Sequence, residues 1–361
     1  MSPSVKDGHA ETPTTQRRQR SSSRSSVRDL VRRASNASSS SLHSLKDRIF
    51  GRRRSSNVSS VSQARPPANP AIVEQLREAV RAEMELKMAT ASEQDSVTKK
   101  FDSRDVNYVL TDSQFLPRVV TEYHDESDSN TIQRMVKVVT DCLRLRKKYD
   151  FFDVQPEEFP SEIYDTDSAC GYEKPGEPVY VFLRVKYVTK IPPFDYMYTR
   201  YLIAHVNRLI HRMKDRSLNI VVDCTGLSFG QLDLIVHIAW TMYGAFPGWL
   251  GSCYIIELPF VMKAGLYVML KVFPERIRSK IFIDSASGTI DTIGPDRCPS
   301  FIGGTGDANL EWSSDPEHKP ANCITMEELA IKMNASKAVV EKAKKAVLTA
   351  LKQANKEKAN R

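Results

Sequence analysis

Two short strings of this chain resemble parts of nucleotide-binding sites. The string VVDCTG at Val221–Gly226 has the D-x-x-G turn that follows a strand in nucleotide hydrolases. Those enzymes also hold phosphate in a G-x-x-x-x-G-K-[ST] loop, and the sequence contains no such string. The string GGTG at Gly303–Gly306 neither follows a convincing strand nor opens a helix, so it predicts a turn rather than a dinucleotide loop. We therefore expect no nucleotide hydrolysis.

The histidines do not form a set that predicts a metal site or a catalytic centre. His205 and His211 are expected on one helix, but six residues apart they lie on different faces, with no cysteine or carboxylate at ligand spacing. His237 lies in an apolar helix and is expected to be packed and hydrogen-bonded. The sequence also lacks a G-x-S-x-G nucleophile motif. We therefore expect a protein that is not an enzyme and needs no cofactor.

One helix has an unusual surface. The segment FVMKAGLYVMLKVF, Phe260–Phe273, is apolar nearly all round, and its two lysines are eight residues apart, or about 80° on a helical wheel. A surface helix normally has one polar side. Either this helix is fully buried in the core, or it lines an apolar cavity on one side and meets a membrane on the other. On the second interpretation the candidate lipid-binding residues are Phe260, Met262, Leu266, Met269, Leu270 and Phe273.

The same region contains the best candidate for a membrane span. The stretch Tyr254–Phe273 is mostly apolar, but it contains Glu257, Pro259, Lys263 and Lys271, which make a poor spanning helix. We predict a strand followed by a helix instead.

Strands and helices are expected to alternate through the centre of the chain. β-Branched and aromatic runs predict strands, and helical spacing of apolar residues predicts the helices between them. This alternation predicts an α/β architecture with a mostly parallel sheet. The expected strands are Glu177–Thr189, Ser217–Cys224, Ser252–Leu258 and Arg278–Ile283, and the expected helices are Met197–Arg216, Gln231–Phe246 and Phe260–Phe273.

Helices are also expected on both sides of this unit. Residues 70–88 should form a helix that Asn69 caps, and residues 104–150 should be mostly helical. At the C-terminus a capping box, Thr325 with Glu328, should open one helix that runs to Lys358. We describe this helix as an appendage or a partner-binding helix, because its large apolar residues form no compact stripe. They are Leu329, Ile331, Val339, Val340 and Leu348.

The positive charge of the chain is confined to one end. The sequence has 52 basic and 44 acidic residues, but residues 1–65 hold 14 basic and 4 acidic ones. The remainder therefore carries a net charge of −2, which does not predict a nucleic-acid-binding domain. Residues 1–68 are rich in serine and arginine and are expected to be disordered. They lack a secretory signal, and the six scattered cysteines are expected to be reduced thiols of a cytoplasmic protein.

The basic tail contains one pattern that predicts membrane contact. In Ser41–Arg54 the apolar residues fall on one helical face, and Arg52, Arg53 and Arg54 follow as an anchor for anionic lipid. The alternative is a disordered linker with chance spacing. Basic residues also precede three serines that a kinase could phosphorylate, which would weaken this attraction. They are Ser35, Ser55 and Ser56.

The order of several motifs resembles the CRAL-TRIO lipid-binding family. The motifs are VVDCTGLS, AFPGWLGSCYIIELPFVMKA, LKVFPERIRSKIFIDS and CPSFIGGT, and the resemblance covers about Asp141–Thr305. It implies a helical N-terminal lobe and an α/β lobe whose sheet floors an apolar pocket, with Phe260–Phe273 at the place of the mobile gate helix. It also implies binding of a single lipid without covalent chemistry. The expected divisions are 1–68, a tail; 69–150, the helical lobe; 151–306, the lipid-binding lobe; and 307–361, a linker and C-terminal helix.

Two motifs of phosphatidylinositol-transferring family members can be compared with this chain. The motif S-K-I-F is present at Ser279–Phe282, and the resemblance implies that Lys280 neutralises a lipid phosphate. The alternative is that Lys280 is a solvated residue at a strand end. In the motif Y-P-E-R-x-G, Gly248 and Trp249 replace the acidic and basic residues. The sequence thus predicts a lipid ligand without naming it, and the alternative function is a membrane-associated scaffold with a vestigial pocket.

Overall fold

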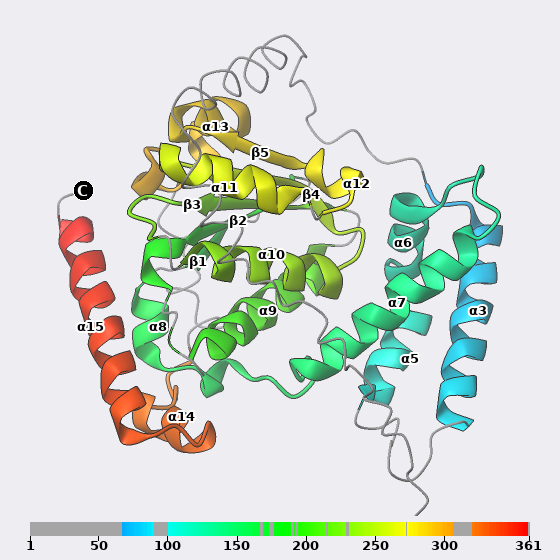
Figure 1. Cartoon of the computed structure of the whole chain (residues 1–361), viewed down its shortest axis with the longest axis horizontal. Coiled ribbons are helices and arrows are strands. Elements are labelled where there is room, and N and C mark those ends of the chain that lie inside the picture. Colours follow the sequence, from blue (N-terminus) through cyan, green and yellow to red (C-terminus); the bar gives the residue numbers. More distant parts are fainter. Residues whose placement is uncertain are drawn as a thin grey trace, which may run out of the picture.

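The computed structural model shows a helical lobe beside an α/β lobe, with a C-terminal helix along the far side of the α/β lobe (Figure 1). The basic tail, including Ser41–Arg54 and the three predicted phosphorylation sites, lies outside the residues that the structure describes. Those residues are 67–89, 100–166, 169–172, 177–188, 191, 194–213, 216–228, 231–271, 273–306 and 320–359.

The helical lobe consists of α3 (Pro70–Ala89), α5 (Ser103–Thr111), α6 (Phe115–Tyr123) and α7 (Thr131–Lys148). The predicted cap of its first helix is confirmed, because the side chain of Asn69 accepts a hydrogen bond from the Ala71 amide at 2.9 Å. Helical spacing places one face of α3 in the core of this lobe. The buried residues of that face are Val73, Leu76, Val80 and Met84.

A five-stranded sheet forms the centre of the α/β lobe, with strands in the order in which they occur along the chain. The first strand is antiparallel to the second, and all other neighbours are parallel, so the mostly parallel sheet predicted from the sequence is confirmed. The short antiparallel edge strand was not predicted. The strands are β1 (Ala169–Tyr172), β2 (Val179–Arg184), β3 (Leu218–Asp223), β4 (Leu250–Ile256) and β5 (Ile281–Asp284).

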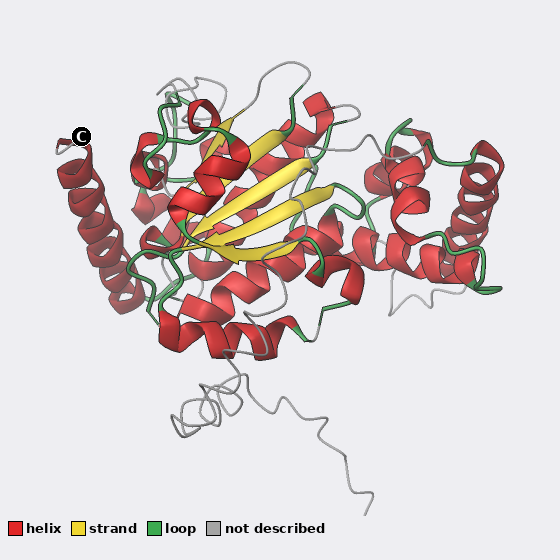
Figure 2. Cartoon of the chain, turned by 90° about the horizontal axis from the view of Figure 1, so that it is seen from above, coloured by secondary structure: helices red, strands yellow, loops and turns green. Residues whose placement is uncertain are grey.

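Helices cover both faces of this sheet (Figure 2). Alternate residues of β2 show the two faces: Val181 packs in the cluster of the helices α9, α10 and α11, whereas Phe182 packs with η6 and α13. Because both faces are buried, every residue of β2 and β3 is buried, and the two strands are mostly apolar rather than alternating. These helices are α8 (Ser161–Asp165), α9 (Phe194–Met213), α10 (Leu232–Ala245), α11 (Phe260–Leu270), α12 (Glu275–Arg278), α13 (Ala286–Ile293) and η6 (Ser300–Ile302).

The stretch Tyr254–Phe273 contains the end of β4 and the helix α11, so the predicted strand followed by a helix is confirmed. Among the described helices, none combines the length and the apolar character that crossing a bilayer demands.

The C-terminal region differs from the single helix expected from the sequence. The capping box of Thr325 and Glu328 is present, but the helix α14 (Met326–Lys332) ends before α15 (Lys337–Ala359) begins. The break contains Asn334, whose φ of 49° is left-handed and incompatible with a continuous helix.

The large apolar residues of the C-terminal region, for which the sequence predicted no packed face, are divided between core and surface. Leu329 and Val340 are buried in the main core. Leu348 is 50% exposed, and Ile331 of α14 is 79% exposed. Small residues at helical spacing are buried against the α/β lobe instead, because alanine allows a helix to approach closely. They are Ala343, Val347, Ala350 and Ala354.

Candidate functional site

The helix α11 has apolar side chains on both its inner and its outer side. Met262 and Leu266 are 4% and 2% exposed and lie in the main core of the α/β lobe. Phe260 and Val261, at the first turn, are 59% and 65% exposed. The helix lies close to α10, because a Cβ added at Gly265 would be 3.7 Å from Leu232 Cδ2. This helix is therefore neither fully buried nor a surface helix with a polar outer side.

The end of this segment packs against an exposed aromatic residue. Phe273 is buried and stacks on Trp240 of α10, with ring centroids 4.6 Å apart and an interplanar angle of 18°. Trp240 is 40% exposed, and it was not predicted as a site residue. Leu270 is partly buried against the main core. The side chain of Met269, also predicted to contact lipid, lies outside the part of the chain that the structure describes.

Lys280 faces the helical lobe. Its ammonium donates hydrogen bonds to both carboxylate oxygens of Glu122 on α6, at 2.6 and 2.7 Å, and to the carbonyl of Leu250 at 3.0 Å. Both side chains of the ion pair are largely buried, so Lys280 is not a solvated residue at a strand end. Glu122 thus gives Lys280 an acidic partner from another lobe, 158 residues away in the sequence.

The same helix explains why the Y-P-E-R-x-G motif is altered in this chain. Gly248 has a φ of 80°, and a Cβ there would lie 2.6 Å from the Arg118 carbonyl oxygen of α6. The Arg118 guanidinium stacks on the ring of Trp249, 3.8 Å from its centroid. Gly248 and Trp249 therefore form a surface on which α6 packs. Their role becomes visible only when the contact between the two lobes is known.

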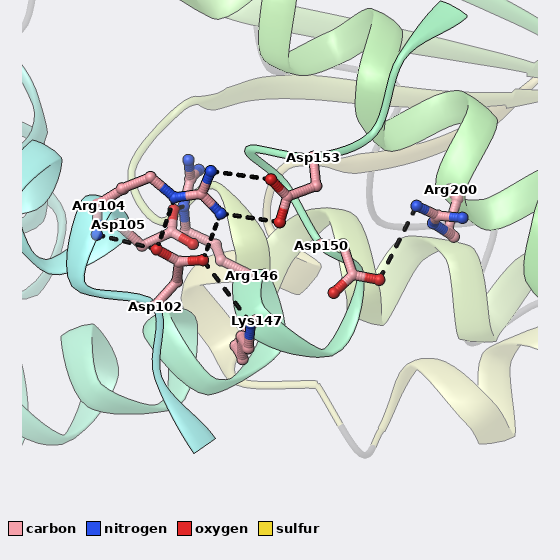
Figure 3. A network of polar contacts seen from close by, with 8 residues as sticks. All are labelled: Asp102, Arg104, Asp105, Arg146, Lys147, Asp150, Asp153 and Arg200. Carbon is pink, nitrogen blue, oxygen red and sulfur yellow. Dashed lines mark hydrogen bonds and ion pairs between the residues drawn. The ribbon is translucent and has the colours of Figure 1, made fainter. Parts of the chain in front are cut away.

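The segment Lys100–Val106, with the sequence KFDSRDV, contains the start of α5 and forms part of a charged network between the lobes (Figure 3). Asp102 caps α5 and pairs with Arg104, and that hydrogen bond is the largest influence lowering the pKa of Asp102, to about 2. Arg104 also makes two hydrogen bonds of 2.8 Å to Asp153, which follows α7 in the connection to the α/β lobe. The exposed part of the network thus joins the start of α5 to that connection.

A buried ion pair lies behind these exposed charges. Arg146 of α7 donates a hydrogen bond to Asp105 of α5, and the side chains are 2% and 1% exposed. The Arg146 guanidinium also lies over the rings of Phe151 and Tyr108, 4.3 and 5.2 Å from their centroids. Burial raises the pKa of Asp105 in spite of the positive charge of Arg146. Arg146 is therefore the main group that stabilises the ionised form of this buried carboxylate.

A surface groove of about 480 Å³ lies between α3 and α7 in the helical lobe. It contains none of the residues predicted to bind lipid. Among the described residues no group of histidine, cysteine, aspartate and glutamate side chains is placed to hold a metal ion.

Comparison with protein families identifies one domain in the α/β lobe. Residues 167–304 match the family model of the CRAL/TRIO domain. The sequence matches none of the curated proteins with which it was compared. Among the solved structures, 32 chains match. One is the crystal structure of Sfh5, at 14% identity and a TM-score of 0.47, where the match covers 73% of this chain and 96% of that one.

The matched segment extends from the residues just before β1 to the turn after η6, so it contains the whole sheet and the helix α11. The segment 167–304 therefore has the CRAL-TRIO fold that the sequence predicts, a mostly parallel sheet between layers of helices.

Proposed function

We propose that this protein binds a single lipid in an apolar pocket of the α/β lobe and presents or transfers it at membranes, without catalysing a reaction. The observation that supports this function is the helix α11. Its inner residues Met262 and Leu266 are packed in the core, whereas Phe260 and Val261 expose apolar surface at its first turn. A helix with this distribution can exchange its inner contacts for a lipid chain while its outer side contacts a membrane.

The remaining candidate residues take their roles from the same proposal. Leu270 and Phe273 would extend the apolar wall, and Met269 stays a candidate on sequence grounds alone. Lys280 would bind the lipid phosphate, and the phosphate would then replace the carboxylate of Glu122. Within the family, the strings KFDSRDV, FLRVKY and GGT most resemble the corresponding domain of motile sperm domain-containing protein 2, a relation that stays a prediction.

Lipid extraction from the purified protein tests the function directly. We expect organic solvent to release a stoichiometric amount of one lipid class, identified by mass spectrometry. An empty protein would favour the second candidate, a membrane-associated scaffold with a vestigial pocket. The exposed Ile331 and Leu348 of the C-terminal helices favour that alternative, because exposed apolar side chains are typical of partner-binding surfaces.

The outer surface of α11 gives a prediction about membrane contact. Replacing both Phe260 and Val261 by aspartate should slow lipid transfer between vesicles about tenfold or more, because charged residues are strongly disfavoured in a membrane interface. The exchange of fluorescent lipid between donor and acceptor vesicles measures this rate.

The matched control combines Ile331→Asp with Leu348→Asp, which places the same two charges at apolar residues that are 79% and 50% exposed on the C-terminal helices. Transfer by the control should equal that of the unmodified protein. Equal slowing by both variants would remove the outer side of α11 from the proposal.

The basic tail gives a second prediction. Deletion of residues 1–65 should weaken sedimentation with anionic vesicles, and the difference should be largest at low salt, where screening is weakest. We propose that Arg52, Arg53 and Arg54 make this peripheral attachment in the cytoplasm, and that phosphorylation of Ser35, Ser55 or Ser56 reduces it. Identical sedimentation before and after deletion would exclude the tail from membrane binding.

A further inference from the structure

The end of β2 holds a cluster of positive charge that lipid binding by α11 does not use. Arg184 is the last residue of β2, and Lys186 and Tyr187 follow in the short helix η3 (Val185–Tyr187). All three side chains contact the carboxylate of Glu357, near the end of α15. Lys186 Nζ donates to Glu357 Oε1 at 2.9 Å, the Tyr187 hydroxyl donates to Oε2 at 2.8 Å, and Arg184 forms an ion pair with the same group.

Arg184 is only partly satisfied by this carboxylate. The residue is 1% exposed, and its guanidinium lies 4.5 Å from the ring centroids of both Tyr187 and Phe301. Among the described residues only Nη2 finds hydrogen-bond partners, whereas Nε and Nη1 are buried and have none there. Asp223, the neighbour of Arg184 in register on β3, accepts a hydrogen bond from the Thr225 amide at 2.9 Å.

A phosphate group matches such a cluster better than a carboxylate does. A guanidinium offers five N–H donors in a fork that suits phosphate, and unmade hydrogen bonds at a buried charge are unfavourable. Phosphate brings more acceptor oxygens and more negative charge than one carboxylate, and here two cations and a hydroxyl surround the same point.

The helix that supplies Glu357 is attached in a way that permits release. Its last turns meet the lobe through Ala350 and Ala354, which form a small cluster with Tyr187 that is separate from the main core. Alanine side chains bury little apolar area, so the contact contributes little to stability. The charged contact of Glu357 is therefore the main specific attachment of this end of α15.

We propose that Arg184, Lys186 and Tyr187 form a phosphate-binding site, separate from the lipid-contacting helix, which Glu357 of the C-terminal helix occupies as an internal ligand. A phosphate group that binds there displaces Glu357 and releases the end of α15. Whether the end of α15 is docked or released thereby depends on whether phosphate occupies this site.

The internal ligand is ionised under ordinary conditions. Burial by itself raises the pKa of Glu357, but the hydrogen bonds from Lys186 and Tyr187 and the charges of Lys186 and Arg184 outweigh it and lower the pKa to about 2. A lowered carboxylate pKa means that the contact stabilises the docked helix above pH 4.5 and loses this effect as the pH falls toward 2.

Titration of the full-length protein with inorganic phosphate, followed by calorimetry, tests the proposal. Glu357→Gln keeps the shape of the side chain and removes its charge. We expect this variant to bind phosphate between about tenfold and a thousandfold more tightly than the unmodified protein, because states that are open in the absence of ligand are commonly populated at about 0.1–10%.

Two further variants make the result specific. Glu341→Gln changes the same charge at an exposed residue of α15 and should leave phosphate affinity unchanged. Lys186→Met in the Glu357→Gln background should abolish the gain. If Glu357→Gln binds phosphate no better than Glu341→Gln, the proposal is overturned.

Hydrogen exchange and vesicles complete the test. In the unmodified protein, saturating phosphate should reduce amide protection in residues 350–359, and unchanged protection would overturn the displacement of Glu357. Sedimentation of Glu357→Gln with phosphatidylcholine vesicles that contain phosphatidic acid separates the sources of phosphate. Enhanced sedimentation identifies a lipid headgroup as the ligand, whereas binding of inorganic phosphate alone identifies a soluble phosphate compound.

Discussion

Replacing Asp105 by alanine is expected to lower the free energy of unfolding by about 3–5 kcal/mol, because it leaves the charge of Arg146 buried without a partner. The side chains of Asp105 and Arg146 are at most 2% exposed. The aromatic rings of Tyr108 and Phe151 that flank Arg146 cannot replace the negative charge of the lost carboxylate. Urea denaturation followed by circular dichroism measures the change.

A matched control separates burial from charge. Asp141→Ala removes a carboxylate that pairs with Lys137 and Arg144 on the exposed side of α7, and surface pairs contribute about 0–1 kcal/mol. A double variant, Asp105→Leu with Arg146→Met, should recover most of the lost stability, because well-packed apolar residues can replace a buried pair. Equal losses from Asp105→Ala and Asp141→Ala would show that the buried pair has no special role.

Replacing Leu266 by tryptophan is expected to abolish lipid uptake. Leu266 points from α11 into the main core and is 2% exposed, so the larger ring occupies the volume into which a lipid chain would enter. Overpacking of this kind typically costs about 1–3 kcal/mol, which a domain of this size can lose without unfolding. Uptake of fluorescent lipid from liposomes measures the effect, and circular dichroism confirms that the variant is folded.

The same substitution on the outer side of the helix provides the comparison. Val261 is 65% exposed, so Val261→Trp adds the ring without filling the interior and should leave uptake intact. Unchanged uptake by a folded Leu266→Trp protein would refute the assignment of α11 as a pocket wall. Loss of uptake in both variants would do the same, because it would not depend on the inner side.

Local patterns in the sequence were sufficient to predict most of the helices and strands. The β-branched runs that became β2 and β3 and the capping box at Thr325 depend on residues a few positions apart, so their geometry follows from the backbone. The apolar character of α11 predicted a helix without a polar side, and Phe260 and Leu266 lie on its exposed and buried sides. By contrast, the break in the C-terminal helix was not predicted. It depends on one residue in the left-handed conformation, Asn334, and an asparagine within a helical pattern is too weak a signal to predict a break.

The alanine stripe of α15 was missed for a related reason. The large apolar side chains of this region form no compact stripe, so the sequence predicted an appendage or a partner-binding helix rather than a packed face. In the structure Ile331 and Leu348 are exposed, whereas Ala343 and Ala354 are buried. Alanine is common in any helix, so its spacing predicts a buried face only when a neighbouring surface is known.

The sequence by itself therefore determined the alternation of strands and helices and the apolar character of α11. Only the tertiary structure decided the charged contacts. Lys280 meets Glu122 across 158 residues, and Arg184 meets Glu357 across 173. The physical reason is that periodicity reports which side of an element is buried, whereas the partner of a charge depends on how whole elements dock, and no local pattern in the chain encodes that geometry.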